Sequence, residues 1–175
     1  RMAGTLYGPT LQKDLYPNGI PTIKQLQNKL RDLGLMKHMH YTDAEYAQLE
    51  AIIDHSIDFD YRHFQIKHIT RKYAIQNRDT NEIYESPQFT FMRMAMEVSS
   101  KEPVGKRIEN IREFYRFLAD NTINAPSPNY ISLGTPQSGL MSCCLYKAGD
   151  AIGSLNTADT IAYRMTAIGA GIGGF

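Results

Sequence analysis

Apolar residues recur at intervals of three and four along most of the first 120 residues, and this spacing predicts amphipathic helices. The first such face follows Pro21 and ends before Gly34; it consists of Ile23, Leu26, Leu30 and Leu33. Thr42-Asp43-Ala44-Glu45 has the form of a capping box and predicts a second helix, whose apolar face includes Leu49. The pattern therefore predicts a helical domain.

Further elements follow in the middle of the chain. A short helix is expected over 61–71, and the turn residues between Tyr73 and Tyr84 predict a hairpin. Ser86-Pro87 predicts a capping residue followed by proline in the first helical turn. The next helix, 89–98, is apolar almost all round and should be buried. Pro103 predicts the start of another amphipathic helix.

The pattern changes after Asn121. Residues 121–138 are rich in proline and serine and predict a loop at a domain boundary. Leu140 to Tyr146 predict a buried strand, a helix should then run to Gly169, and a second strand should begin near the end of the sequence. We therefore expect a linker or remnant of a preceding domain over 1–20, a helical domain over 21–122 and the opening of an α/β domain over 123–175.

Composition narrows the function classes. The formal net charge of +1 gives no electrostatic argument for binding nucleic acid or an anionic membrane. No apolar run approaches the roughly 18 residues that span a bilayer, and the start of the sequence lacks the apolar stretch of a secretory signal. The two cysteines are adjacent and cannot form a disulfide framework, so a reducing, cytoplasmic setting is expected.

Three patterns could carry chemistry. The glycines of 169–174 fit G-x-G-x-x-G, but they follow a predicted helix instead of a strand, which favours a helix end over a dinucleotide site. The five histidines lack the spacing of helix-borne zinc ligands, so no metal site is expected. Cys143-Cys144 is compatible with two buried structural thiols or with a redox role, and the spacing leaves both open.

A set of segments, taken together, resembles the large (catalytic, alpha) subunit of class I ribonucleotide reductases, in its N-terminal part. The hairpin-to-helix segment 76–89 reads QNRDTNEIYESPQF. It is followed by Ser127-Pro128, Thr135-Pro136, Ser142-Cys143 and Gly149-Asp150, and by the closing Ala170-Gly171-Ile172-Gly173. The resemblance covers nearly the whole chain and is firmest from residue 73 onward.

The resemblance implies a mixed α+β and α/β fold. A helical N-terminal domain would lead into the first strand-helix-strand of a ten-stranded α/β barrel, completed by another chain or by a missing segment. It also implies an oxidoreductase, a ribonucleoside-diphosphate reductase that makes deoxyribonucleotides for DNA synthesis by radical chemistry. The sequence alone is too short for that reaction, and the expected fragment would be inactive by itself.

The resemblance also implies residue roles. Cys143, six residues before the glycine of Gly149-Asp150, matches a redox-active cysteine, and Cys144 falls where the family usually has an apolar residue. The doublet departs from the usual Ser-Ser-Cys. Ser127, Ser142, Cys143 and Gly171 match substrate-binding positions, with Ser127 in place of a threonine. Asp150, Ala151 and Ile152 match the site of the allosteric specificity effector, where a serine commonly stands at the position of Ala151.

Implied partners are the remaining C-terminal part of the large subunit, a second large subunit, a radical-generating small subunit that contains metal, and the ribonucleotide substrate. Nucleoside triphosphates would be effectors, and thioredoxin or glutaredoxin the external reductant; no cofactor is expected on this chain itself. Two other classes remain open from the residues alone. One is a non-catalytic helical interaction module with a glycine-rich tail, and the weaker one is a nucleotide-binding regulatory domain that rests on Asp150.

Overall fold

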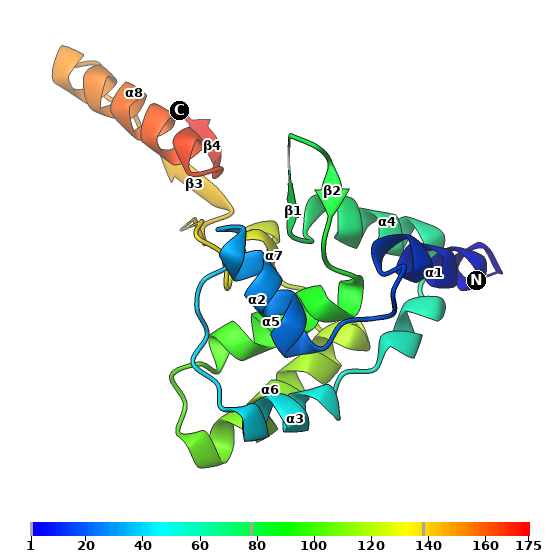
Figure 1. Cartoon of the computed structure of the whole chain (residues 1–175). Coiled ribbons are helices and arrows are strands. Elements are labelled where there is room, and N and C mark those ends of the chain that lie inside the picture. The colour runs from blue at the N-terminus through cyan, green and yellow to red at the C-terminus, as the bar shows by residue number, and fades with distance from the viewer. Residues whose placement is uncertain (1, 78, 138) are drawn as a thin grey trace.

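The computed structural model describes residues 2–77, 79–137 and 139–175, with side chains from Leu6 onward. In chain order the elements are α1 (Met2–Leu15), α2 (Ile23–Asp32), α3 (Asp43–Glu50), the 3-10 helix η1 (His55–Phe59), α4 (His63–Lys72), β1 (Gln76–Asn77), β2 (Glu82–Ile83), α5 (Pro87–Val98), α6 (Val104–Ala119), α7 (Ser127–Ser132), β3 (Cys143–Tyr146), α8 (Ile152–Ala167) and β4 (Gly171–Gly174). Elements α1 to α7 form a helical body, from which β3, α8 and β4 project (Figure 1).

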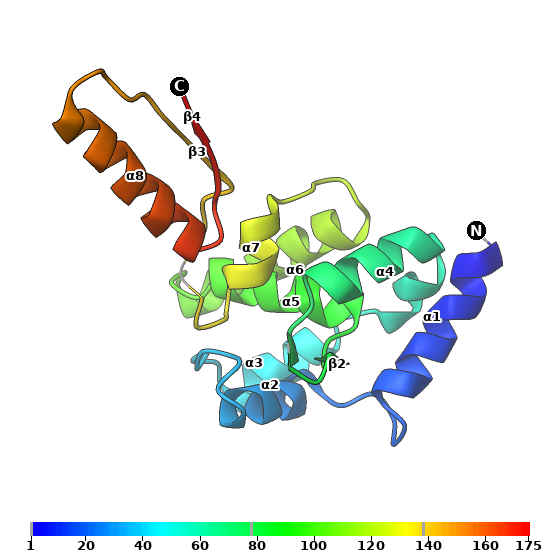
Figure 2. The ribbon, with the colours of Figure 1, turned by 90° about the horizontal axis from the view of Figure 1, so that it is seen from above.

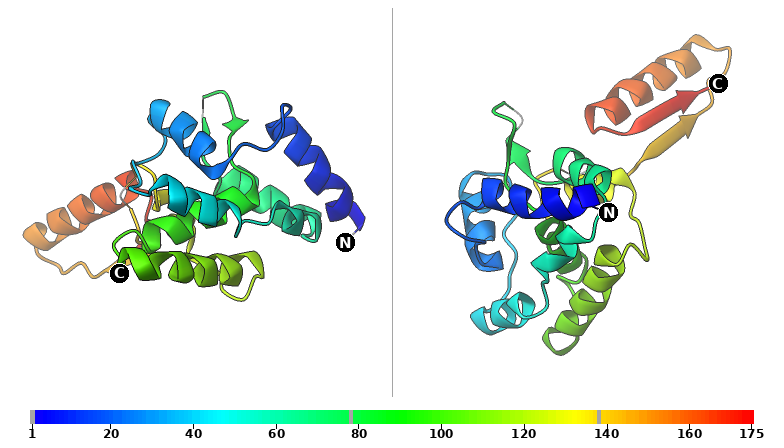
Figure 3. Two further views of the ribbon diagram at one scale, coloured as in Figure 1. Left: turned by 60° about the horizontal axis from the view of Figure 1, so that its bottom comes forward. Right: turned by 90° about the vertical axis from the view of Figure 1, so that its right-hand side faces the viewer.

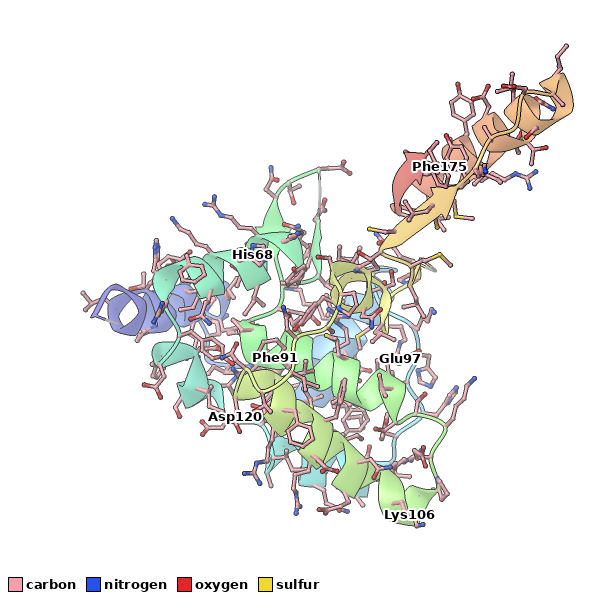
Figure 4. The ribbon with its side chains drawn as sticks, turned by 180° about the vertical axis from the view of Figure 1, so that it is seen from behind. His68, Phe91, Glu97, Lys106, Asp120 and Phe175 are labelled. Carbon is pink, nitrogen blue, oxygen red and sulfur yellow. The ribbon has the colours of Figure 1, made fainter. Side chains whose placement is uncertain are left out.

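Helix α5 lies at the centre of the helical body. It packs against α4, α6, α7 and η1, and its residues from Pro87 to Met96 are all buried. This confirms the prediction that an apolar surface all round a helix marks a buried one. Figure 4 shows Phe91 in the middle of the body, where only 2% of the residue is exposed.

The predicted helix starts are mostly confirmed. Thr42 Oγ1 accepts a hydrogen bond from the Glu45 N–H at 3.3 Å, and the Thr42 N–H donates to Glu45 Oε2 at 2.8 Å, which is a capping box. Ser86 occupies the predicted capping position, but its side chain makes no capping bond, and its Oγ is buried without a partner among the residues that the structure describes. The predicted capping position of Ser86 before Pro87 is confirmed, and the Tyr16 hydroxyl accepts the Ser86 N–H at 3.0 Å.

Two segments belong to the helical body that the pattern placed outside it. Helix α1 packs on α4 and η1 and places Leu11 in the common core, whereas the sequence suggested a linker, or a helical remnant of a preceding domain followed by a loop, over 1–20. The expected loop over 121–138 contains α7, which packs against α5 and buries Tyr130. The helical body therefore extends through α7. The hairpin of β1 and β2 is antiparallel, as predicted, with Gln76 paired to Ile83.

The last elements form a strand-helix-strand unit. Strands β3 and β4 are parallel, with Cys143 opposite Gly171 and Tyr146 opposite Gly174. Helix α8 lies along the two strands (Figure 3) and packs on β4. Its less exposed residues recur on one side of the helix and are Ser154, Ala158, Ile161, Ala162 and Met165. The expectation that 140–146 is buried was wrong, because Leu140, Met141 and Leu145 are 54%, 54% and 80% exposed. Strand β3 pairs only with β4, and the side chains on one of its faces stay exposed in the described structure.

The unit meets the helical body through a short, tight segment. Figure 2 shows it beside α7 and extending away from the other helices. The Ser132 hydroxyl donates to the Gly139 carbonyl at 2.6 Å, and the Lys37 N–H donates to the Gly134 carbonyl at 2.8 Å. These bonds tie the segment that precedes β3 to the end of α7 and to the residues after α2.

Candidate functional site

Strand pairing brings three of the predicted substrate-binding residues together. The Gly171 N–H donates to the Ser142 carbonyl at 2.9 Å, and Gly171 is the register partner of Cys143. A Cβ built at Gly171 would lie 3.5 Å from Cys143 Sγ and 3.1 Å from the Ser142 carbonyl oxygen. Glycine thus leaves this side of β4 open beside the thiol. Ser142, Cys143 and Gly171 are all exposed.

The two adjacent thiols differ in environment. Cys143 is exposed and Cys144 is half-buried, and the same alternation continues with Leu145 and Tyr146. Successive strand side chains point to opposite faces, so the two thiols lie on opposite faces of the sheet. Cys144 Sγ lies 3.0 Å from Met141 Sδ. Both cysteines are free, and the face that carries Cys143 has no covering element in the described part of the chain.

The predicted effector residues lie at the other end of the unit. Asp150 and Ala151 immediately precede α8, and Ile152 is its first residue; Ile152 is 85% exposed. The Gly149 N–H donates to Ser154 Oγ at 2.7 Å, which fixes the turn into the helix. This turn follows the carboxyl end of β3, whereas Cys143 begins the strand. The structure therefore separates Asp150, Ala151 and Ile152 from the group around Cys143.

Ser127 lies in the helical body as the first residue of α7. Its Oγ is 3.0 Å from the Tyr73 hydroxyl, and no hydrogen bond joins it to β3 or β4 among the described residues. The Tyr73 ring stacks on that of Tyr130, with centroids 4.4 Å apart and planes at 11°. Ser127 is thus held by the body, and the other three predicted substrate residues by the projecting unit.

A buried ion pair that the sequence analysis missed fixes this part of the body. Arg93 Nε donates to Glu85 Oε1 at 2.8 Å, and both side chains are at most 2% exposed. The guanidinium also donates to the Tyr130 carbonyl at 3.0 Å and to the Leu133 carbonyl, while Glu85 accepts from the Ile75 N–H. One pair therefore joins the hairpin, α5 and α7. An arginine inside an otherwise apolar helix is the signal that could have predicted it.

The pKa values of Glu45 and Asp58, two buried carboxylates elsewhere in the helical body, are shifted. A hydrogen bond from Arg107 holds the pKa of Glu45 down at about 2, in a buried ion pair that joins α3 to α6. Burial raises the pKa of Asp58 to about 7, although Gln88 donates to its Oδ1 at 2.9 Å. Among the described residues, the second carboxylate oxygen of Asp58 has no hydrogen-bond partner.

The described residues contain no group of three or more His, Cys, Asp or Glu side chains placed to hold a metal ion. The glycines of 169–174 form a helix end and a strand, with Gly169 at φ 81°, as the sequence analysis favoured. None of the helices described has the length and apolar character needed to cross a bilayer.

Comparison with known proteins identifies the family. Residues 59–138, from the end of η1 to the segment before β3, match the family model described as "Ribonucleotide reductase, all-alpha domain". The chain is 33% identical over 133 residues to ribonucleoside-diphosphate reductase 1 subunit alpha of Escherichia coli K12, covering 76% of this chain and 18% of that protein. The alpha subunit of enterobacteria phage T4 is 32% identical over the same shares of the two chains.

A more distant relative extends the comparison. The large subunit of Trypanosoma brucei brucei is 29% identical over 102 residues, covering 57% of this chain and 12% of that protein. The chain spans about a fifth of the length of the bacterial and phage relatives. The helical body supplies the matched all-alpha domain, and the strand-helix-strand unit follows it. The chain belongs to the family of ribonucleotide reductase large subunits.

Proposed function

We propose that this chain forms part of a ribonucleoside-diphosphate reductase large subunit and supplies a redox-active thiol, Cys143, with substrate contacts from Ser127, Ser142 and Gly171. The observation that carries the proposal is the exposed thiol beside Gly171 on the uncovered face of the β3–β4 sheet. Family membership supports the reaction class. The two strands would open a ten-stranded barrel whose other strands cover that face.

Cys143 would act as one half of a two-electron dithiol donor. Cys143 and a second cysteine from the remaining part of the large subunit would form a disulfide and release two electrons and two protons. These would replace the 2′-hydroxyl of the ribonucleotide by hydrogen, with the oxygen leaving as water. Thioredoxin or glutaredoxin would reduce the disulfide, and the radical would come from a metal-containing small subunit. This chain alone is therefore expected to be inactive.

The effector end would serve a separate role. Asp150, Ala151 and Ile152 would contact a nucleoside triphosphate effector near the interface with a second large subunit. Asp150 is exposed, directly before α8, where its carboxylate can accept a hydrogen bond from a ribose hydroxyl. Separation from Cys143 along the unit suits a regulatory site that differs from the reaction site.

The proposal is tested by two serine substitutions in the assembled enzyme with a dithiol reductant. Cys143→Ser should abolish multiple turnover, because no disulfide can form there. Cys144→Ser, the matched control on the other face, should retain turnover and lose at most about 1–3 kcal/mol of stability for enclosing an unpaired hydroxyl. If Cys144→Ser abolished turnover and Cys143→Ser left it normal, Cys144 would be the redox-active thiol.

A further inference from the structure

Ser127 is linked to two side chains of the α4 segment that the family resemblance does not involve. Its Oγ lies 3.0 Å from the hydroxyl of Tyr73, and the same hydroxyl lies 3.1 Å from Nε2 of His68. His68 and Tyr73 rings meet edge to face, with centroids 5.0 Å apart. The three polar groups therefore form a continuous chain from an exposed histidine on α4, labelled in Figure 4, to the start of α7.

Tyr73, the middle residue of this hydrogen-bonded series, is fixed through both its ring and its backbone. The Tyr73 ring stacks on Tyr130, a residue that is 4% exposed. The Arg93 guanidinium donates to the Tyr130 carbonyl at 3.0 Å and approaches the Tyr73 carbonyl at 3.5 Å. Because one buried cation contacts the backbone of both tyrosines, the Tyr73 hydroxyl has a defined position relative to Ser127.

Ser127 does not use its hydroxyl for the local backbone. Helix α7 follows Pro126, which occupies the capping position and makes no side-chain capping bond. The Tyr73 hydroxyl is the partner that the described structure gives to Ser127 Oγ. The function of that contact therefore depends on which of the two oxygens donates.

The protonation of His68 determines the direction of the hydrogen bond between Tyr73 and Ser127. A hydroxyl has one proton to donate and lone pairs to accept with, and an imidazole nitrogen that carries a proton is a donor. When His68 Nε2–H donates to the Tyr73 oxygen, the Tyr73 O–H is directed to Ser127 Oγ. The Ser127 proton is then left to point outward, toward a ligand that accepts hydrogen bonds. The opposite direction would turn the Ser127 proton inward to Tyr73.

We propose that Tyr73 and His68 are positioning residues that orient the Ser127 hydroxyl as a donor to the ribonucleotide substrate. This inference rests on the proposed function, in which Ser127 contacts the substrate. A phosphate oxygen is the acceptor that suits it, because a charged oxygen is the strongest acceptor that a ribonucleotide carries. Tyr73 and His68 themselves do not touch the substrate and act through Ser127.

The test is a double-substitution cycle in the assembled enzyme, with KM and kcat measured for the ribonucleotide. Tyr73→Phe keeps the stack on Tyr130 and removes the link, so KM should rise roughly tenfold with kcat within about twofold. Ser127→Ala should have a similar effect, and adding Tyr73→Phe to Ser127→Ala should raise KM no further. Independent, multiplying effects of the two changes would overturn the positioning role, because a structural effect would persist without Ser127.

Further variants test whether losing any tyrosine hydroxyl raises KM and whether His68 acts as a hydrogen-bond donor. Tyr46→Phe, which removes a 2.8 Å bond from a half-buried tyrosine to Gln27, is the matched control and should leave KM unchanged. His68→Leu, at an exposed position, should raise KM. His68→Gln, whose amide can also donate a hydrogen bond to Tyr73, should bring KM most of the way back to the wild-type value. Unchanged KM in both Tyr73→Phe and His68→Leu would overturn the inference.

A binding measurement separates this inference from the proposed function. The affinity of the assembled enzyme for the ribonucleotide, measured by calorimetry without reductant, should fall roughly tenfold in Tyr73→Phe. Normal binding by Tyr73→Phe together with loss of turnover in Cys143→Ser would reject the positioning role alone. Turnover that persists in Cys143→Ser would instead reject the proposed redox role of that thiol.

Discussion

Asp58 is a carboxylic acid that α1 and α5 hold away from water, with 1% of the residue exposed. Gln88 donates a hydrogen bond to one of its oxygens, and the other has no partner in the described part of the chain. Close packing by α1 contributes to the burial, since a Cβ at Gly8 would lie 3.0 Å from the Asp58 carbonyl oxygen. Desolvation favours the neutral acid, which is why the pKa rises to about 7.

This shift predicts a pH dependence of stability. Because the folded pKa of Asp58 is about 7, above its ordinary value of 3.8, the unfolded chain ionises first as pH rises. The contribution of the neutral acid is fully present below about pH 4 and is lost as pH rises through about 7. Asp58→Asn should therefore gain stability relative to wild type between pH 4 and 8, by up to about 4 kcal/mol.

Urea unfolding of residues 1–140 at several pH values measures this difference. That segment holds the helical body and retains the bond from Ser132 to Gly139. Asp60→Asn, on an exposed neighbour that water already solvates, is the control and should follow wild type. A difference between Asp58→Asn and wild type that stays constant from pH 4 to 8 would contradict the assignment.

At the scale of elements, periodicity and caps were enough to predict most helices, because each helix turns a continuous apolar stripe to the core. Helix α7 was missed since its six residues include a proline and resemble a loop in composition. Exposure was harder to predict. Leu33 follows the apolar spacing of α2, yet it is 50% exposed, because it lies just past the helix end.

In the candidate site, too, local patterns predicted some features and tertiary packing determined the others. Family motifs selected Ser127, Cys143 and Gly171, and the parallel register brings Cys143 and Gly171 together. They gave no indication of Arg93 and Glu85, whose pairing depends on tertiary packing of the hairpin, α5 and α7, nor of the contact between Ser127 and Tyr73. Residues 54 positions apart in sequence, as Tyr73 and Ser127 are, share no local pattern.

Gly139 carries a prediction about how β3 and α8 are joined to the body. A Cβ at this position would lie 2.5 Å from the Ile168 carbonyl oxygen, a backbone atom that cannot rotate away. Gly139→Ala should therefore displace the end of α8 and destabilise the strand pair by about 1–3 kcal/mol. In the assembled protein, hydrogen exchange of the Gly171 and Ala148 amides should accelerate roughly tenfold or more.

The matched control is Gly153→Ala in α8, where an added Cβ would meet no atom within 4 Å. Alanine there should be neutral or slightly stabilising, because it favours the helix over glycine. Equal exchange rates in Gly139→Ala and Gly153→Ala would show that the close approach at Ile168 does not constrain the unit.

At the scale of the whole molecule, apolar surface is unevenly distributed. The helical body buries most of its large apolar residues in one core around α5, whereas the strand-helix-strand unit buries few. The exposed large apolar residues of the unit are Leu140, Met141, Leu145, Ile152, Leu155, Tyr163, Ile168, Ile172 and Phe175. Figure 4 shows Phe175 on the projecting unit. In the described part of the chain, the β3–β4 pair has no backbone partner at either outer edge, which favours association with further strands.

The last prediction follows from this contrast. Residues 1–140 should form a monomer that unfolds cooperatively, because the core of the helical body is complete within them. Residues 1–175 alone should self-associate through the open sheet, and addition of the remaining part of the large subunit should suppress this. Leu145→Lys, at a position 80% exposed on the uncovered face, should weaken self-association. Asn156→Lys adds the same charge on exposed α8 and should have less effect. Size-exclusion chromatography with light scattering distinguishes the cases: a monomeric 1–175 chain whose β3 and β4 amides resist exchange would mean that the unit is stable without further strands.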